Sequence, residues 1–143
     1  MVALVAGKAI KVRAGHQRQM GLAAGVKVYA GGIAVLTATG VARAGYTATG
    51  LKAIGYFETD ADNTSGADNA VTVSVRRDVV QLVNSTSTDA ITAADINNVC
   101  YIVDDQTVAK TNGTNTRSAC GRIVDVDATG VWVDIGDAAM PTT

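Results

Sequence analysis

The chain has 143 residues with a net charge of −1, and no stretch approaches the ~18 consecutive apolar residues that would make a transmembrane helix. It is rich in alanine, valine and threonine (24, 20 and 17 copies) but holds one phenylalanine, one tryptophan and one proline. Because branched side chains favour strands and the length suits one domain, we expect an all-β protein, a small barrel or sandwich of short strands. Its core of small aliphatic side chains should be thin, which predicts a homo-oligomer.

The first 20 residues lack the periodicity of a strand or a helix, and they predict an extended arm that becomes ordered on contact with a partner. The segment MVALVAGKAIKVR begins apolar, but its three basic residues interrupt it before the apolar core of a signal peptide forms. We therefore expect a soluble chain made in the cytoplasm, with the arm at 1–20 followed by a single β domain at 21–143.

Glycine-punctuated strands are predicted from residue 26 onward. VKVYA and IAVLTA, separated by Gly31-Gly32, are typical of a hairpin, because a Gly-Gly pair tolerates the positive φ angles of tight turns. The rhythm of strands and turns continues to LKAIGYFE. The polar, acidic stretch TDADNTSGADNA at 59–70 predicts a mobile surface loop.

Alternating valines mark the next strand. In AVTVSV, the side chains of Val71, Val73 and Val75 fall on one face and are expected to be buried. The pattern slips at 76–78 and resumes as VVQLV, which indicates a bulge or a new strand. TAAD at 92–95 resembles a capping box and predicts one short helical turn, the only helix expected.

The last third of the chain holds most of the side chains that suggest chemistry, yet strands and turns account for them. Strands are predicted at 101–103, 107–109, 119–126 and 131–135. Val131, Val133 and Ile135, with Ile123 of the preceding strand, should be buried. Trp132 alternates with them, so it is expected on the opposite face, in a second layer or at a subunit contact.

The two cysteines, Cys100 and Cys120, could form a disulfide, half of a metal site or a pair of small buried hydrophobes. A hairpin that turns near Asn112-Gly113 would place Cys120 opposite residues 105 or 106, away from Cys100. Without a signal peptide, and with neither cysteine in a CxxC spacing, free thiols are favoured over a disulfide and zinc is not expected.

Catalytic constellations are not evident in the sequence. The neighbouring carboxylates Asp104 and Asp105 are assigned to a turn, because adjacent strand residues point to opposite faces. Asp125 and Asp127 lack the spacing of a calcium loop, and the only histidine, His16, lies in the arm with no apparent nucleophile beside it. The sequence therefore predicts a non-enzymatic protein with no metal, no cofactor and no nucleic-acid motif, whose function is contact.

The charges are unevenly distributed along the chain. Residues 1–57 contain seven basic and no acidic residues, whereas residues 58–143 contain five basic and thirteen acidic ones, so +7 and −8 give the total of −1. This asymmetry would steer one half toward an acidic partner, or one copy toward another. In the alternative interpretation both halves share one barrel and their charges simply face water.

A family resemblance is carried by residues 91–135. The segments IVDDQTVAKT, TRSACGRIVDVD and GVWVDI resemble the strand, short link and final hairpin of tailed-bacteriophage capsid decoration proteins, also described as head cement proteins. The resemblance covers about a third of the chain, and the preceding glycine-punctuated strands are loosely similar. These motifs lie on strands and turns, so they indicate a fold rather than a chemistry.

The resemblance implies a structural virion protein, made in the bacterial host cytoplasm, that sits on the outer capsid surface and bridges neighbouring capsid subunits. Its partners would be the major capsid protein of a tailed phage and further copies of itself, with a trimer favoured and a dimer as the alternative. Neither nucleic acid nor membrane is expected as a partner, and the alternative function is another virion component such as a tail or fibre module. The arm would lie along an acidic capsid surface, which makes the candidate capsid contacts Lys8, Lys11, Arg13, His16 and Arg18.

Overall fold

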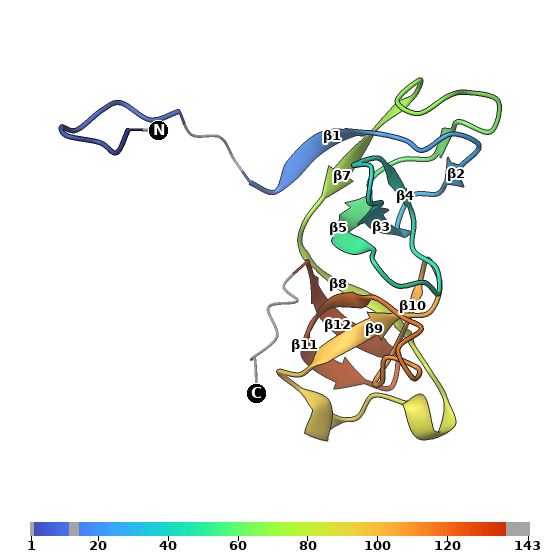
Figure 1. Ribbon diagram of the computed structural model, residues 1–143. Helices are drawn as coiled ribbons and strands as arrows, with labels where there is room; N and C mark the ends of the chain where they lie inside the picture. Colours follow the sequence, from blue (N-terminus) through green and yellow to red (C-terminus); the bar gives the residue numbers. More distant parts are fainter. Residues whose placement is uncertain (1, 12–14, 137–143) are drawn as a thin grey trace.

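The computed structural model describes residues 2–11 and 15–136, and nearly all of its regular structure is strand. An open five-stranded sheet and a closed five-stranded barrel follow one another along the chain (Figure 1). The prediction of an all-β fold is confirmed. No helix among the described residues has the length and apolar character needed to cross a membrane.

The open sheet is built from the first half of the chain, and all its strands are antiparallel. Their order is β1 (Gln17–Gly21), β7 (Thr72–Arg76), β5 (Lys52–Phe57), β3 (Ile33–Leu36) and β4 (Ala42–Ala44). A separate pair, β2 (Lys27–Val28) with β6 (Ala61–Asp62), contacts β4. Together they enclose a cluster of buried side chains: Leu22, Val28, Ala34, Ala42, Ile54, Phe57, Val73 and Val75.

The barrel is built from the second half of the chain. Its order is β10 (Thr107–Ala109), β8 (Val79–Asn84), β12 (Gly130–Ile135), β11 (Ala119–Asp127) and β9 (Val99–Ile102), which returns to β10. The pair of β8 and β10 is parallel and the others are antiparallel. Between β8 and β9 lie two 3-10 turns, η1 (Ser87–Asp89) and η2 (Ala93–Asp95).

Strand β3 joins the two cores. Ala34 belongs to the cluster of the open sheet, whereas Ile33 and Val35 pack into the barrel core, as the alternation of side chains along a strand requires. Glycine at position 55 allows the neighbouring strands to meet closely, because a Cβ there would lie 2.2 Å from the carbonyl oxygen of Arg76. The end of β7 is thereby held against β5, where the chain crosses from sheet to barrel.

Two predicted elements in the first half differ from the structure. Residues 17–20 of the expected arm belong to β1, where Gln17 lies opposite Arg76 and Gly21 opposite Thr72. Its side chains are mostly exposed, so the strand carries no apolar alternation. The predicted hairpin across Gly31-Gly32 is also wrong, because β2 pairs with β6 while β3 pairs with β4 and β5.

The loop at 59–70 lies at the surface as predicted, but it contains β6 and is fastened to the segments before and after β2. Asp60 and Asp68 accept hydrogen bonds of 2.8 Å from the backbone amides of Ala30 and Ala24. Asn63 is buried, and its Nδ2 donates to carbonyl oxygens on both sides of the loop. The acidic composition therefore caps backbone groups rather than marking a free segment.

The second half agrees closely with the sequence. Each of its four predicted strands is present within two residues, and the capping box of η2 forms with Thr92 N donating to Asp95 Oδ2 at 2.8 Å. The turn η1 was not predicted. The expected buried set is confirmed for Val73, Val75, Ile123, Val131, Val133 and Ile135, while Val71 is half-buried.

Candidate functional site

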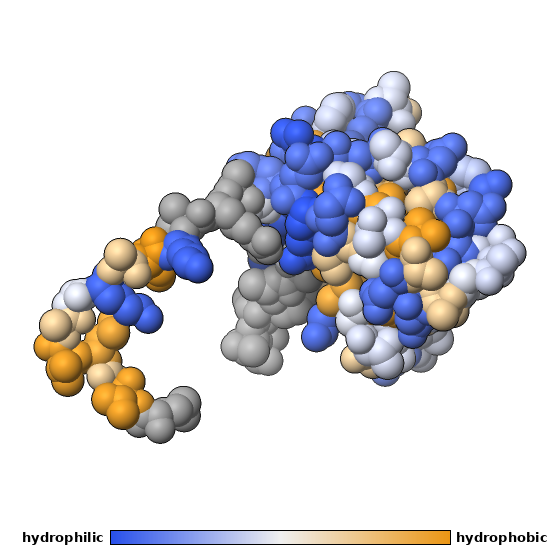
Figure 2. Space-filling view, turned by 90° about the horizontal axis from the view of Figure 1, so that it is seen from above, coloured by the Kyte–Doolittle hydropathy of each residue, from blue (hydrophilic) through white to orange (hydrophobic). Residues whose placement is uncertain are grey.

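The segment 2–11 extends from the folded part without strand or helix, as Figure 1 and Figure 2 show. Four large apolar side chains on it are exposed to 93% (Val2), 69% (Leu4), 96% (Val5) and 77% (Ile10). Lys8 and Lys11 are exposed between and after them. Such a density of exposed apolar groups is typical of a surface that meets a partner. Arg13, the third basic residue of this region, lies outside the described residues.

A basic crevice lies where β1 begins. Two adjoining cavities of about 330 and 90 Å³ share His16 and Arg77 in their linings. Arg18 lines the smaller cavity, and Asp78 and Asp134 line the larger one. The carbonyl oxygen of His16 accepts a hydrogen bond of 2.7 Å from the backbone amide of Arg77. This bond ties the start of β1 to the link between β7 and β8, which explains why residues 61 positions apart share one opening.

The smaller cavity of the crevice is positively charged, because Arg18 and Arg77 line it and no acidic residue of the described part does, whereas the larger cavity also holds Asp78 and Asp134. Asp78 is engaged by Arg76, whose Nε lies 2.9 Å from its Oδ2. Among the described residues, Arg18 and Arg77 form no ion pair. A guanidinium group presents a planar fork of donors that matches a carboxylate, so the crevice suits an acidic partner.

The carboxylates that first suggested chemistry close turns, as predicted. Asp104 Oδ1 accepts hydrogen bonds from two backbone amides of its own turn, at 2.8 and 2.9 Å. Asp127 accepts from the Thr129 hydroxyl and from the indole nitrogen of Trp132, and these bonds lower its pKa to about 2. A group held ionised in this way is poorly matched to proton transfer near neutral pH.

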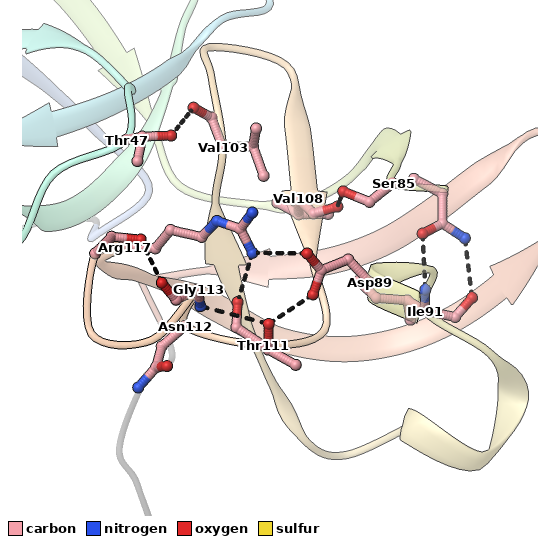
Figure 3. A network of polar contacts seen from close by, with 12 residues as sticks. Thr47, Ser85, Asp89, Ile91, Val103, Val108, Thr111, Asn112, Gly113 and Arg117 are labelled. Atoms are coloured by element: carbon pink, nitrogen blue, oxygen red, sulfur yellow. Dashed lines mark hydrogen bonds and ion pairs between the residues drawn. The ribbon is translucent and has the colours of Figure 1, made fainter. Parts of the chain in front are cut away.

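A second polar cluster, shown in Figure 3, is also structural. Asp89 of η1 accepts from the Thr111 hydroxyl at 2.5 Å and from a terminal nitrogen of Arg117 at 3.2 Å. These hydrogen bonds, that of Thr111 first, lower the pKa of Asp89. Arg117 also donates to the carbonyl oxygen of Thr111 at 3.0 Å. The cluster holds the 111–117 loop against the 3-10 turn and closes that end of the barrel.

Cys100 and Cys120 are free and buried, which confirms the prediction of unbridged thiols. Their expected separation is wrong, because β11 pairs with β9 and places Gly121 opposite Cys100. The hydrogen bond with Cys100 and burial raise the pKa of Cys120. Neither thiol has the exposed, electropositive surroundings of a reactive cysteine.

Comparison with protein-family models, curated proteins and solved structures found no match. Over residues 2–11 and 15–136, no group of three or more His, Cys, Asp or Glu side chains could hold a metal ion.

The sequence predicted two of the three basic residues that line the crevice. His16 and Arg18, two of the candidate contacts, come together there, whereas Lys8 and Lys11 lie on the arm. Arg77 was not singled out as a contact, although the slip in the valine pattern at 76–78 marked a break in the strand. Trp132 is half-buried on the outer face of the barrel, opposite the core as predicted.

Proposed function

We propose that this chain is a structural virion protein that binds the outside of a tailed-phage head and stabilises it by bridging neighbouring major capsid subunits. The observation that carries the proposal is the smaller cavity of the crevice at the start of β1, which is lined by His16, Arg18 and Arg77 and, among the described residues, by no acidic one. An acidic side chain on the shell would fit between these groups. The resemblance of residues 91–135 to head cement proteins supports the same role.

Bridging needs contacts that reach beyond one folded body, and the segment 2–11 is long enough to make them with the shell or with a neighbouring bound copy. Ten extended residues span about 30 Å, so the contacts of one copy extend well past its folded part. Repeated over a shell, many weak contacts bind through avidity. A trimer at a threefold position of the shell, or a dimer at a twofold one, would multiply them further.

The turn-closing carboxylates and buried thiols support a role without catalysis. Asp104 and Asp127 are occupied by hydrogen bonds within the chain, and both cysteines are buried. Contact is therefore the function that these described residues favour.

Co-sedimentation with tailed-phage shells that lack their decoration tests the proposal. The wild-type chain should bind saturably, at a fixed number of copies per shell. The double substitution Arg18→Glu and Arg77→Glu should weaken binding by about tenfold or more, because like charges would face the acidic shell. Lys27→Glu with Lys110→Glu changes the same charge away from the crevice and should bind like the wild type.

Equal binding by the crevice variant, with its fold intact by circular dichroism, would rule out the crevice as the shell contact. No saturable binding by the wild type to any shell would rule out the cement role. Binding to purified tails in place of heads would identify a tail or fibre module.

A further inference from the structure

The barrel carries a second exposed surface, on the outer face of three neighbouring strands. This surface, termed here the barrel wall, consists of Val79 and Val83 on β8, Trp132 and Asp134 on β12, and Val124 and Asp125 on β11. Trp132 lies between the outer strands, opposite Gln81 on one side and Asp125 on the other. The wall therefore combines an indole, three valines and carboxylates on one face.

The valines of the barrel wall are unusual among the described residues. Val79, Val83 and Val124 are each 46% exposed. The other large apolar residues exposed on the folded part are Tyr29 and Tyr46, and each of these rings has a cation over it, from Lys27 at 5.4 Å and Arg43 at 4.1 Å. Val79 and Val83 flank Gln81 on β8, and Val124 lies on β11, the second strand along, with Trp132 of β12 between them, so the indole connects the valines into one surface.

The charge of the wall is negative at the end nearest the β11–β12 turn, where Asp125 and Asp127 lie. Asp125 and Asp134 lie on the wall, and Asp127 and Asp78 flank it at the β11–β12 turn and before β8. At the other end two arginines offset Asp134: Arg122 lies opposite it and donates to the carbonyl oxygen of Asn97 at 2.6 Å, and Arg77 lines one cavity with Asp134 and Val79. A partner that fits the turn end of the wall would be apolar and basic.

The arm of this same chain has that chemistry. The segment 2–11, here called the arm, carries Val2, Leu4, Val5 and Ile10 together with Lys8 and Lys11. The first acidic residue of the chain is Glu58. In its own copy the arm leaves the molecule on the side of the open sheet and stands clear of the barrel (Figure 1). Its apolar side chains are consequently left exposed.

We propose that the arm of one copy lies across the barrel wall of a second copy. An extended arm of about 30 Å is long enough to cross three strands spaced about 4.8 Å apart. The contact joins two different surfaces, so reciprocal exchange closes a dimer and successive exchange closes a ring. Lys8 and Lys11 thereby gain the wall carboxylates as partners, while His16 and Arg18 remain at the crevice. The proposal requires no shell and is independent of shell binding.

Self-association of the full chain, measured by sedimentation velocity over a range of concentrations without any shell, tests this exchange. The wild type should sediment as a multiple of the single chain, and the emission of Trp132, the sole tryptophan, should shift to the blue as it associates. The arm variant Leu4→Asp with Val5→Asp should associate about tenfold or more weakly. The wall variant Val83→Lys with Val124→Lys should lose association equally, whereas Tyr29→Lys, on an exposed ring away from the wall, should retain it.

Mixing the arm variant with the wall variant gives the decisive result. The first keeps an intact wall and the second an intact arm, so an equimolar mixture should form a 1:1 complex although neither associates alone. No complex in the mixture, with both variants folded by circular dichroism, would overturn the proposal. A wild type that sediments as a single chain at every concentration would also overturn the proposal. If the Trp132 emission of that single chain changed in the arm variant, the arm would cover the wall of its own copy instead.

Discussion

The indole nitrogen of Trp132 donates a hydrogen bond of 3.0 Å to Asp127 Oδ2. The other carboxylate oxygen accepts the backbone amides of Thr129 and Gly130 in the turn that joins β11 to β12. One side chain thus closes the turn and orients the ring on the barrel wall. The same bonds connect the ionisation of Asp127 to the environment of the tryptophan.

Acid titration should reveal this connection. The pKa of Asp127 is about 2 in the folded chain, below its ordinary value of 3.8. Because the folded value is the lower one, the carboxylate's contribution to stability is fully present above about pH 4 and is lost as the pH falls through 2. Trp132 emission should therefore stay constant down to about pH 4 and then change with a midpoint near 2. Asp127→Asn should abolish that transition and Asp105→Asn should preserve it. A wild-type midpoint near 4 would contradict the lowered pKa of Asp127, and a transition that survives in Asp127→Asn would show that the indole does not sense this carboxylate.

Replacing Asn63 should destabilise the first half of the fold. Its buried Nδ2 donates to the carbonyl oxygens of Ala23 and Ala67, both at 2.9 Å, and Asn63→Ala leaves these acceptors without their donor. The expected loss in the free energy of unfolding is about 1–3 kcal/mol, measured by urea denaturation. Ser65→Ala, at an exposed position of the same loop, should change stability by less than about 0.5 kcal/mol. Equal effects at the two positions would mean that the loop contributes nothing through Asn63.

Glycine at position 55 should be required for the crossing from sheet to barrel. Its φ is +144°, and a Cβ would lie 2.2 Å from the carbonyl oxygen of Arg76. Gly55→Ala should lower the free energy of unfolding by about 2–4 kcal/mol, because backbone strain and a forced displacement of β7 both contribute. Gly50 has a φ of +78° with open space around it, so Gly50→Ala should cost only the backbone part, about 1–2 kcal/mol. Similar losses in the two variants, by thermal or urea unfolding, would exclude the close contact with β7.

The sequence predicts the barrel better than the open sheet for a physical reason. Strands β11 and β12 are neighbours in sequence and alternate buried with exposed side chains, so Val131 and Val133 reveal both their strand and its buried face. Strand β1 instead pairs with β7, more than fifty residues away, and its QRQ is exposed. Local alternation is absent where a strand lies at a sheet edge, and pairing over such distances leaves no local signal.

The candidate sites, too, are predicted only where their residues lie close together in the sequence. The sequence placed His16 and Arg18 near each other because they are two residues apart, but only the backbone hydrogen bond from Arg77 to His16 brings the third cation into the crevice. The thiols were misplaced for a similar reason. Predicting a simple hairpin around Asn112-Gly113 ignored the 111–117 loop, which Asp89 holds against η1 while β11 pairs with β9.

The buried thiols provide a test of how rigid the barrel is. Cys100 and Cys120 are fully buried in adjacent strands, and Cys100 Sγ donates to the carbonyl oxygen of Gly121 at 3.5 Å. A cysteine thiolate must attack the disulfide bond of Ellman's reagent and displace one of its thiolates, so neither buried cysteine should react in the native chain, and both should react in urea. In the control variant Ser65→Cys, the added exposed thiol should react at once and release one equivalent of the reagent's thiolate. If Cys100 or Cys120 reacted in the native chain at the rate of that control, the barrel would open between β9 and β11 without unfolding. If their reaction followed the unfolding rate, the two strands would separate only when the whole barrel unfolds.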